Sequence, residues 1–383
     1  MSRTIDIHAL QAVPPSCLNR DQSNSPKTAI YGGERRMRVS SQSWKRAMRD
    51  YSISRFDKDD YGARTLNVVP MIAERLVTLG KADTVADAVP VVKKALADAG
   101  VLFKYAKVKG KGKKTEESDQ LDALFFIGNR QLDAVAADIA KDDAEFEGDD
   151  KAKARGKAIR HDISSGHSID LALYGRMLAH QPELDLEAAA EVAHAIGVSP
   201  VQTEFDYFSA IDDHSLENHS GGAMIGDIEY DSGVLYRYAS LSMPVLERNL
   251  ENNEDMERKA VREFVDSFIQ SMPTGRQKSF AAETLPDTVI VEVHEGRPRS
   301  LAGAFEDPVT PERGIMTAAR ERLGGYLRRV DEAYGFDGSR LILSLSEGPD
   351  VDATPAATLA QLEDEVTNAA LAEDDNRRDG QAS

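Results

Sequence analysis

Hydrophobic and polar residues alternate along the first stretch of the chain. Between residues 3 and 13, Ile5, Ile7 and Ala9 alternate with Asp6 and His8, which predicts a strand with one buried and one exposed face. Met37 and Val39 share one face of a second, shorter strand expected at 35–39. Further strands are predicted at 232–243, 288–293 and 340–346.

A short amphipathic helix is predicted directly after the second strand. The apolar positions that recur at helical spacing are Trp44, Ala47, Met48 and Tyr51. Ser40 and Ser41 precede them and are suitable N-cap residues. Lys45, Arg46 and Arg49 lie off the apolar face, so the helix is expected to carry a basic flank.

The middle of the chain is predicted to be mainly helical. Residues 64–161 have helical patterns, interrupted at 104–117 by a loop rich in lysine and glycine. Residues 168–178 are expected to return to strand structure, and 186–197 to form a helix. The polar stretch 199–232, with a glycine-rich turn, predicts an extended hairpin.

Helices are also predicted at 254–271, near 312–334 and in the last part of the chain, before an acidic tail that is expected to be disordered. The order of these elements predicts an α+β fold of ferredoxin-like character, with a helical insertion and a protruding hairpin.

Composition restricts the class of protein. The chain has 383 residues, of which 41% are hydrophobic, a formal net charge of −18 and one cysteine. A single cysteine, Cys17, excludes an intrachain disulfide and a zinc site built on several thiolates. The N-terminus lacks the pattern of a signal peptide, and no apolar run approaches the length that spans a bilayer. We therefore expect a soluble cytoplasmic protein.

One basic segment stands against this acidic background. Residues 29–50, AIYGGERRMRVSSQSWKRAMRD, carry their arginines and lysines around the predicted strand-to-helix junction. The free N–H groups at a helix start form an anion site, and Ser40, Ser41 and Gln42 add neutral donors there. A solvated basic face is the simpler alternative. Contact with a phosphate backbone is favoured, because the donors converge on one helix start.

Two other segments are candidates for nucleic-acid contact. Tyr207 and Phe208 are adjacent in the predicted hairpin, so they point to opposite faces and one of them is available to stack on bases, although packing into the hairpin base is the alternative. Met177 is expected in the core by default. The lysine-rich loop fits either a solvated turn or a salt-dependent contact with nucleic acid.

Catalytic motifs are not found. The eight histidines are scattered, without a metal-binding spacing, and GGERR does not match a phosphate-binding loop. The sequence predicts no enzyme activity, no metal site and no cofactor.

The assembled segments resemble the backbone subunit of type I-E CRISPR Cascade complexes, the CasC family. The stretches that carry the resemblance, in order along the chain, are IDIHAL, PSCLNRD, AIYGGERRMRVSSQSWKRAMR, DLALYGRM, FDYFSAIDD, DSGVLYRYASL and YGFDG followed by LSLS. The match is weakest over the helical insertion and the C-terminal tail.

The resemblance implies a palm of RNA-recognition-motif type, helical fingers and a thumb hairpin. The corresponding ranges are palm at 1–63, 166–198 and 233–350, fingers at 64–165, thumb at 199–232, and a C-terminal helix and tail at 351–383. In the family, copies stack head to tail along a CRISPR RNA, grip its phosphates and displace nucleotides at regular intervals. The remaining bases stay free to pair with target DNA.

Residue by residue, the resemblance assigns RNA contacts across the palm and thumb. These are Arg20, Lys27, Arg36, Arg38, Ser40, Ser41, Gln42, Lys45, Arg46, Arg49, Met177, Tyr207 and Phe208. Among the cations, Arg36 and Arg38 are less secure assignments than those on the helix. Contact with target DNA is a further expectation for Lys107, Lys109, Lys111, Lys113 and Lys114.

The expected partners are CRISPR RNA, target DNA, copies of the chain itself and the other Cascade subunits: large, small, guide-processing and 5′-end-capping. No membrane partner is expected. The alternative function is a metal-dependent ribonuclease that uses Asp21 of the palm loop, as related backbone subunits in other CRISPR types do.

Overall fold

The chain divides into two compact units in the computed structural model, which describes residues 3–101, 103–109, 115–142, 145–146, 150–178, 181–210, 224–310 and 314–372. The first unit comprises residues up to Ser52, Glu191–Ser242 and residues from Val261 onward. The second unit comprises Ile53–Ala190 and Met243–Ala260.

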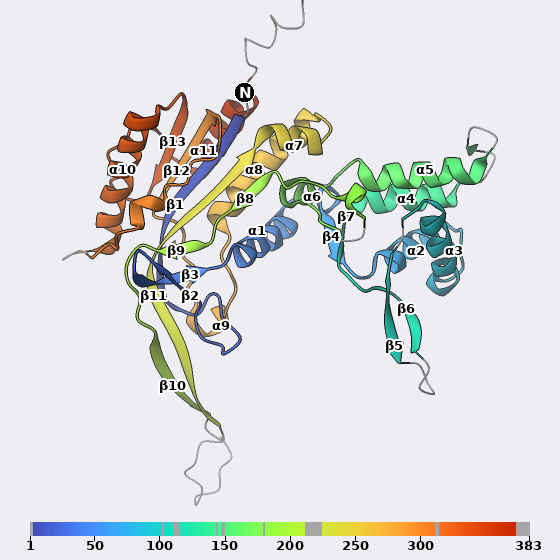
Figure 1. Ribbon diagram of the computed structural model, residues 1–383, viewed down its shortest axis with the longest axis horizontal. Helices are drawn as coiled ribbons and strands as arrows, with labels where there is room; N and C mark the ends of the chain where they lie inside the picture. The colour runs from blue at the N-terminus through green and yellow to red at the C-terminus, as the bar shows by residue number, and fades with distance from the viewer. Residues whose placement is uncertain are drawn as a thin grey trace, which may run out of the picture. The chain divides into compact units, whose positions relative to one another are not determined.

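A large mixed sheet forms the centre of the first unit (Figure 1). Its main path runs through β14 (Thr354–Pro355), β13 (Gly338–Ser344), β12 (Thr288–Glu295), β1 (Arg3–Ser16), β11 (Met224–Ser242), β9 (Ala195–Gly197), β3 (Glu34–Val39) and β2 (Thr28–Tyr31). Two more strands, β10 (Glu204–Ala210) and β8 (Ala190–Val192), pair with β11. The long antiparallel ladders from β1 to β11 and to β12 make β1 a central strand.

Helices from distant parts of the sequence accompany this sheet. They are α1 (Ser41–Arg55), α8 (Glu254–Gln270), α9 (Gln277–Phe280), α10 (Ile315–Tyr334) and α11 (Leu359–Leu371), with the 3₁₀ turn η4 (Ala302–Phe305). Leu323 and Leu327 of α10 pack with Leu10 of β1, Ile290 of β12 and Phe305 of η4 in one buried cluster. This cluster joins segments that are about 300 residues apart in the sequence, so the first unit depends on long-range contacts.

The prediction that β1 exposes its polar face is wrong. Asp6 and His8 are completely buried, as are Ile5 and Ile7 on the opposite face. The polar face is covered because the chain segment before η4 lies over it: the Arg299 backbone N–H donates to Asp6 at 2.8 Å. The alternating pattern identified the strand but not what covers it.

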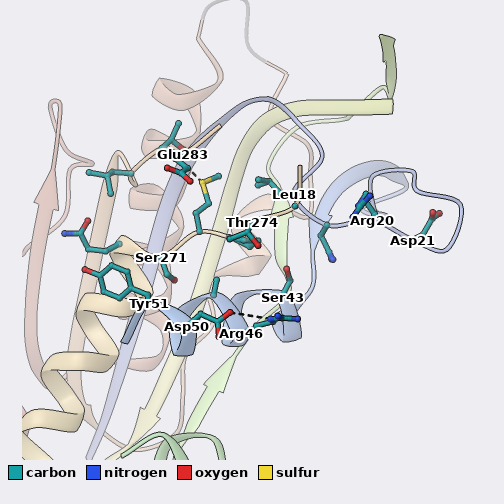
Figure 2. Close-up of a pocket in the computed structure, with 18 of the residues that line it drawn as sticks. Leu18, Arg20, Asp21, Ser43, Arg46, Asp50, Tyr51, Ser271, Thr274 and Glu283 are labelled. Carbon is teal, nitrogen blue, oxygen red and sulfur yellow. Dashed lines mark hydrogen bonds and ion pairs between the residues drawn. The ribbon is translucent and has the colours of Figure 1, made fainter. Parts of the chain in front are cut away.

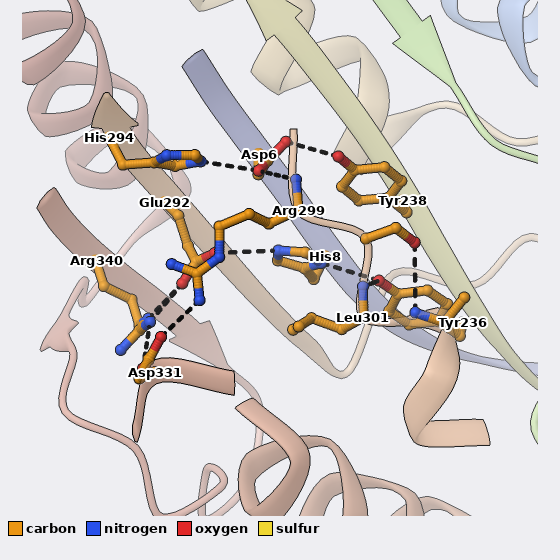
Figure 3. Close-up of polar contacts among 12 residues, drawn as sticks. Asp6, His8, Tyr236, Tyr238, Glu292, His294, Arg299, Leu301, Asp331 and Arg340 are labelled. Atoms are coloured by element: carbon orange, nitrogen blue, oxygen red, sulfur yellow. Dashed lines mark hydrogen bonds and ion pairs between the residues drawn. The ribbon is translucent and has the colours of Figure 1, made fainter. Parts of the chain in front are cut away.

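The buried polar side chains of β1, β11 and β12 form a continuous network (Figure 3). Tyr238 donates to Asp6 Oδ1 at 2.8 Å, and His294 Nε2 lies 2.9 Å from Asp6 Oδ2. His8 Nδ1 lies 2.9 Å from the Tyr236 hydroxyl. Asp6, His8, Tyr236, Tyr238 and His294 thus each have a partner, which offsets part of the cost of removing them from water.

The second unit is mainly helical and has its own core. Its elements are η1 (Lys58–Asp60), β4 (Gly62–Thr65), α2 (Val68–Thr78), α3 (Val85–Asp98), β5 (Tyr105–Lys109), β6 (Thr115–Leu121), β7 (Phe125–Gly128), α4 (Asn129–Ala140), α5 (Lys151–Ser164), α6 (Ile169–Tyr174), η3 (Pro182–Leu184) and α7 (Met243–Asn249). Ile72, Val92, Leu132 and Ile159, one from each of the four long helices, meet in this core.

Three expected elements differ in the structure. Residues 168–178 contain the helix α6, not a strand, because buried Asp170 at its start accepts the Ser168 hydroxyl at 2.7 Å and the Gly62 N–H at 2.9 Å. Residues 186–197 contain the short strands β8 and β9, not a helix, because pairing with β11 outweighs their alanine-rich composition. The expected loop at 104–117 contains the strand β5 and the start of β6, which pair with each other.

The expected hairpin is present as β10 and the first part of β11, paired antiparallel from Glu204↔Tyr230 to Ala210↔Met224. Residues 211–223 of its turn lie outside the described residues. Within the described ranges, no helix has the length and apolarity needed to cross a membrane.

Candidate nucleic-acid interface

The junction between β3 and α1 is fixed by residues outside the basic segment. Asn19 accepts the Ser40 N–H on its side-chain oxygen at 2.9 Å, and its backbone carbonyl accepts the Lys27 N–H at 2.8 Å. The Ser40 hydroxyl accepts the Ser43 N–H at 3.4 Å, as expected of an N-cap. Asn19 therefore connects the preceding loop to the helix start, a role that the sequence reading missed.

The apolar face of α1 determines which of its side chains reach solvent. Trp44 and Met48 are buried, and the Arg237 guanidinium lies 3.7 Å from the centroid of the Trp44 ring. This packing leaves Gln42 and Arg46 exposed and Ser41, Lys45 and Arg49 partly exposed, on the flank predicted to be basic. Burial lowers the pKa of the Lys45 ammonium, and the nearby Glu191 carboxylate opposes that shift.

The loop before β2 adds another cation to this surface. Arg20 is exposed and donates to the Asn24 side chain at 3.3 Å. Asp21 Oδ1 accepts the backbone N–H groups of Ser23 and Ser25, at 2.8 and 3.1 Å. Asp21 thus holds the loop that presents Arg20.

Arg20 and Arg46 line the same groove (Figure 2). The groove has a volume of about 820 Å³, and its far wall is formed by residues 270–275 and 283–285. That size is within the range of ligand sites in proteins. The far wall approaches the Leu18 segment closely: a Cβ atom on Gly275 would lie 2.2 Å from the Leu18 carbonyl oxygen.

Arg36 is removed from the candidate set by its burial. Its side chain is 0% exposed and donates to the carbonyl oxygens of Gly197, Val198 and Glu306 at 3.0–3.2 Å. A guanidinium that is enclosed and bonded in this way stabilises the fold. Arg38 is partly exposed, donates to the Thr28 carbonyl oxygen at 3.3 Å and lies 3.0 Å from His194 Nδ1.

The aromatic pair lies on opposite faces of the hairpin. Tyr207 is 62% exposed, whereas Phe208 is half-buried and lies across Gly226 of the paired strand. Phe205 and Ile225 are exposed like Tyr207. Met177 is 87% exposed, so its default assignment to a core is wrong; it belongs to the second unit.

Two of the predicted DNA contacts lie on strand β5 of the second unit. Lys107 is exposed on β5, and Lys109 is the last residue of that strand. Lys111, Lys113 and Lys114 lie outside the described residues. In the part of the chain that the structure describes, no three His, Cys, Asp or Glu side chains are grouped to hold a metal ion.

Comparison with known proteins extends over nearly the whole chain. The model of the CT1975-like protein family matches residues 5–370. A chain from a solved structure described as "CRISPR RNA-guided surveillance complex, pre-nicking" is 31% identical, with a TM-score of 0.82; the match covers 96% of this chain and all of that one.

A second solved structure, described as "CRISPR RNA-guided surveillance complex", contains a chain with 27% identity and a TM-score of 0.70, again covering 96% of this chain and all of that one. No curated protein matches the sequence. Because the family model spans far more than half of its length, the chain belongs to the CT1975-like protein family.

Proposed function

We propose that the protein is the backbone subunit of a CRISPR RNA-guided surveillance complex of type I-E, and that it binds the guide RNA along its phosphates. The observation that carries this proposal is the capped start of α1, with Arg20 and Arg46 on one groove, in a chain whose formal net charge is −18. The similarity to chains of two surveillance complexes supports it.

The chemistry of this surface suits a sequence-independent grip. The N–H groups at the helix start and the cationic side chains of Arg20, Lys45, Arg46 and Arg49 are donors for phosphate oxygens, which every nucleotide carries. Such contacts fix the position of the RNA without reading its bases. Sequence recognition is then left to base pairing between the guide and target DNA.

The hairpin is the proposed thumb, and residues 64–165, which belong to the helical second unit, are the proposed fingers. Phe208 and Met177 are each proposed to contact a displaced nucleotide, and Tyr207 is the exposed aromatic on the other face of the hairpin. A thumb that covers the RNA held by the next copy makes a head-to-tail contact, and repetition of such a contact generates an open helical filament. The large, small, guide-processing and 5′-end-capping subunits are the remaining proposed partners.

Electron microscopy of the purified chain with guide RNA tests the assembly. We expect RNA-bound helical filaments in which a nucleotide is displaced from the guide at regular intervals. A chain that stays strictly monomeric at every ratio of RNA to protein would contradict the scaffold proposal.

We propose a non-catalytic role, and the ribonuclease alternative has its own test. Asp21 already uses one carboxylate oxygen to hold its loop, which favours a structural role. Complementary RNA is incubated with the assembled complex and Mg²⁺ or Mn²⁺. Cleavage that Asp21→Ala abolishes would establish the alternative in place of the scaffold.

A further inference from the structure

The far wall of the groove continues into a short segment with two cations that the surface described above does not include. Residues 270–275 and 283–285 line the groove, so the intervening residues 276–282, which include α9, start and end at its rim. This far-wall segment carries Arg276 and Lys278 and no carboxylate. In a chain whose formal net charge is −18, it is a second local excess of positive charge.

The fold does not use either cation. Arg276 is partly exposed and Lys278 is exposed, and neither side chain forms a hydrogen bond or an ion pair within the described part of the chain. Arg276 Nε is enclosed, so the terminal nitrogens are the part of the guanidinium that a ligand can reach. Buried Arg36, in contrast, donates to three backbone carbonyl oxygens. Arg276 and Lys278 are therefore available to a ligand, whereas Arg36 is not.

Packing and electrostatics place Arg276 near the loop that presents Arg20. Gly275, the residue before it, lies against that loop so closely that a Cβ atom would meet the Leu18 carbonyl oxygen at 2.2 Å. Burial raises the pKa of the Cys17 thiol, and the guanidiniums of Arg276 and Arg20 both oppose that shift. Charges act on a thiol in this way only at short range, so the two arginines approach the end of β1 from two different segments of the chain.

The backbone of the far-wall segment is held in an unfavourable conformation. Arg276 and Ala281, on either side of α9, have φ angles of 50° and 48°, which residues other than glycine seldom adopt. The Gln277 side chain fixes this geometry, because it donates to the Pro273 carbonyl oxygen at 3.2 Å and accepts the Ala282 N–H at 2.8 Å. Backbone strain persists where the surroundings impose it, and it is concentrated at ligand sites. The strained turn thus presents Arg276 at a fixed position.

The same segment reaches the base of the hairpin. The Phe280 ring packs against the Tyr230 ring, with centroids 5.9 Å apart, and Tyr230 pairs with Glu204 at the end of the β10–β11 ladder. The far-wall segment thus joins the groove to the hairpin, whose Phe208 is proposed to contact a displaced nucleotide. A guide that runs from the groove to the hairpin passes along this segment.

Unpaired guanidinium and ammonium groups at this position need a ligand with anionic oxygens, and the guide supplies a phosphate at every nucleotide. We infer that Arg276 and Lys278 bind guide-RNA phosphates from the far wall, so that the RNA backbone is clamped between them and the cations of α1. This inference rests on the proposed RNA-binding function and adds a second wall to the binding site.

The affinity of the full-length chain for one single-stranded RNA, measured over a range of salt concentrations, tests the inference. Arg276→Gln and Lys278→Gln each remove one charge, whereas Arg276→Lys retains it. Each lost phosphate contact should lower the affinity about five-fold near physiological salt and decrease the slope of log affinity against log salt by about 0.7. Arg276→Lys should keep the slope of the wild-type chain.

Two further variants separate phosphate contact from other effects of substitution. Arg297→Gln is the matched control, because Arg297 is exposed and follows the end of β12, about 25 Å along that strand from the groove residues that precede it. It should leave the affinity and the slope unchanged. Arg276→Gly removes the charge and also relieves the strain, since glycine adopts a positive φ freely. It should lower RNA affinity like Arg276→Gln without lowering the melting temperature.

Equal effects of Arg276→Gln and Arg297→Gln on RNA binding would show that the inference is wrong while the proposed function stands. The inference is also wrong if Arg276→Gln leaves RNA affinity unchanged but weakens association between copies of the chain, because the segment would then meet a protein surface. Absence of RNA binding by the wild-type chain would overturn the proposed function itself.

Discussion

The first unit contains two groups of charged side chains that use the same residue types in opposite ways. In the groove, Arg46 and Asp50 are 3.4 Å apart and largely exposed (Figure 2). In the sheet, Arg340 donates to Glu292 Oε1 from Nε at 2.8 Å and from Nη2 at 2.5 Å, and both residues are buried (Figure 3). The buried pair is committed to the fold, whereas the exposed pair separates at little cost and is available to a ligand.

The pKa values in the sheet reflect this commitment. Burial raises the pKa of the Glu292 carboxyl, but His8, whose Nε2 lies 3.5 Å from Oε2, and Arg340 outweigh burial and lower the pKa to about 2. For His294, burial lowers the pKa, but the hydrogen bond to Asp6, the Glu295 carbonyl oxygen and the nearby carboxylates of Asp6 and Glu292 together outweigh burial and raise it. Partners within the protein therefore favour the charged forms of both Glu292 and His294.

Removing one member of the buried group of charges should cause the largest loss of stability. Arg340→Met removes the guanidinium that Glu292 and Asp331 share and leaves the Glu292 carboxylate buried with one fewer cationic partner, a loss that typically costs about 3–5 kcal/mol of unfolding free energy. Urea denaturation measures the loss. A decrease under about 1 kcal/mol would mean that the network is as dispensable as a surface ion pair.

The pH-dependent contribution of Glu292 to the free energy of unfolding should be nearly as large as the loss caused by Arg340→Met. Its pKa is lowered from an ordinary value of 4.5 to about 2, so its stabilising effect is complete above pH 4.5 and is lost as the pH falls through 2. Glu292→Gln should cost roughly 3 kcal/mol at neutral pH and progressively less below pH 4.5. Denaturant midpoints of both proteins between pH 7 and pH 2 measure this, and a constant difference would contradict the charged state assigned to Glu292.

A smaller loss of stability is expected when Asn19, which connects the loop before β2 to the start of α1, is replaced. Asn19→Ala removes the acceptor of the Ser40 N–H at the start of α1, and the loss of one such hydrogen bond costs about 1 kcal/mol. RNA affinity should fall about five-fold, because the helix start and the Lys27 loop lose their fixed spacing. Asn24→Gly serves as the comparison, because it removes the side-chain partner of Arg20 and glycine tolerates the positive φ of 67° at this position. Equal RNA affinities for Asn19→Ala and the wild-type chain would show that Asn19 does not position the site.

The smallest change in stability should come from the exposed pair itself. Arg46→Gln removes one partner of an exposed i, i+4 ion pair, so the melting temperature should change by less than about 2 °C. Differential scanning calorimetry measures this shift. A drop comparable to that of Arg340→Met would erase the distinction between the two groups of charges.

The sequence allowed the local elements to be predicted better than their surroundings. The helix α1 was predicted correctly because its apolar spacing and its cap lie within a few residues of each other. Asp6, His8 and Arg36 were expected to be exposed, yet segments near residues 299–306 and 197–198 enclose them. Periodicity within a strand contains no information about such distant segments.

Only the local part of the candidate site could be predicted, because periodicity again contains no information about distant segments. The basic flank of α1 is visible in the sequence because its residues are neighbours on one helix. Arg276 and Lys278 belong to a wall that is brought to α1 only by folding, and Asn19 has no charge to attract notice. The polar, glycine-containing stretch at 271–284 was the available signal, but it does not distinguish a groove wall from a solvated loop.

The salt dependence of RNA binding by Lys45→Glu combined with Arg46→Glu tests the central claim most directly. Affinities for several unrelated RNA sequences are measured over a range of salt concentrations, with a melting curve to confirm that the variant is folded. If both side chains bind phosphates, affinity should fall by the same factor, at least about ten-fold, for every sequence, and the slope of log affinity against log salt should decrease by about 1.4. An unchanged slope, or a loss confined to some sequences, would contradict the proposal that this surface grips the RNA backbone.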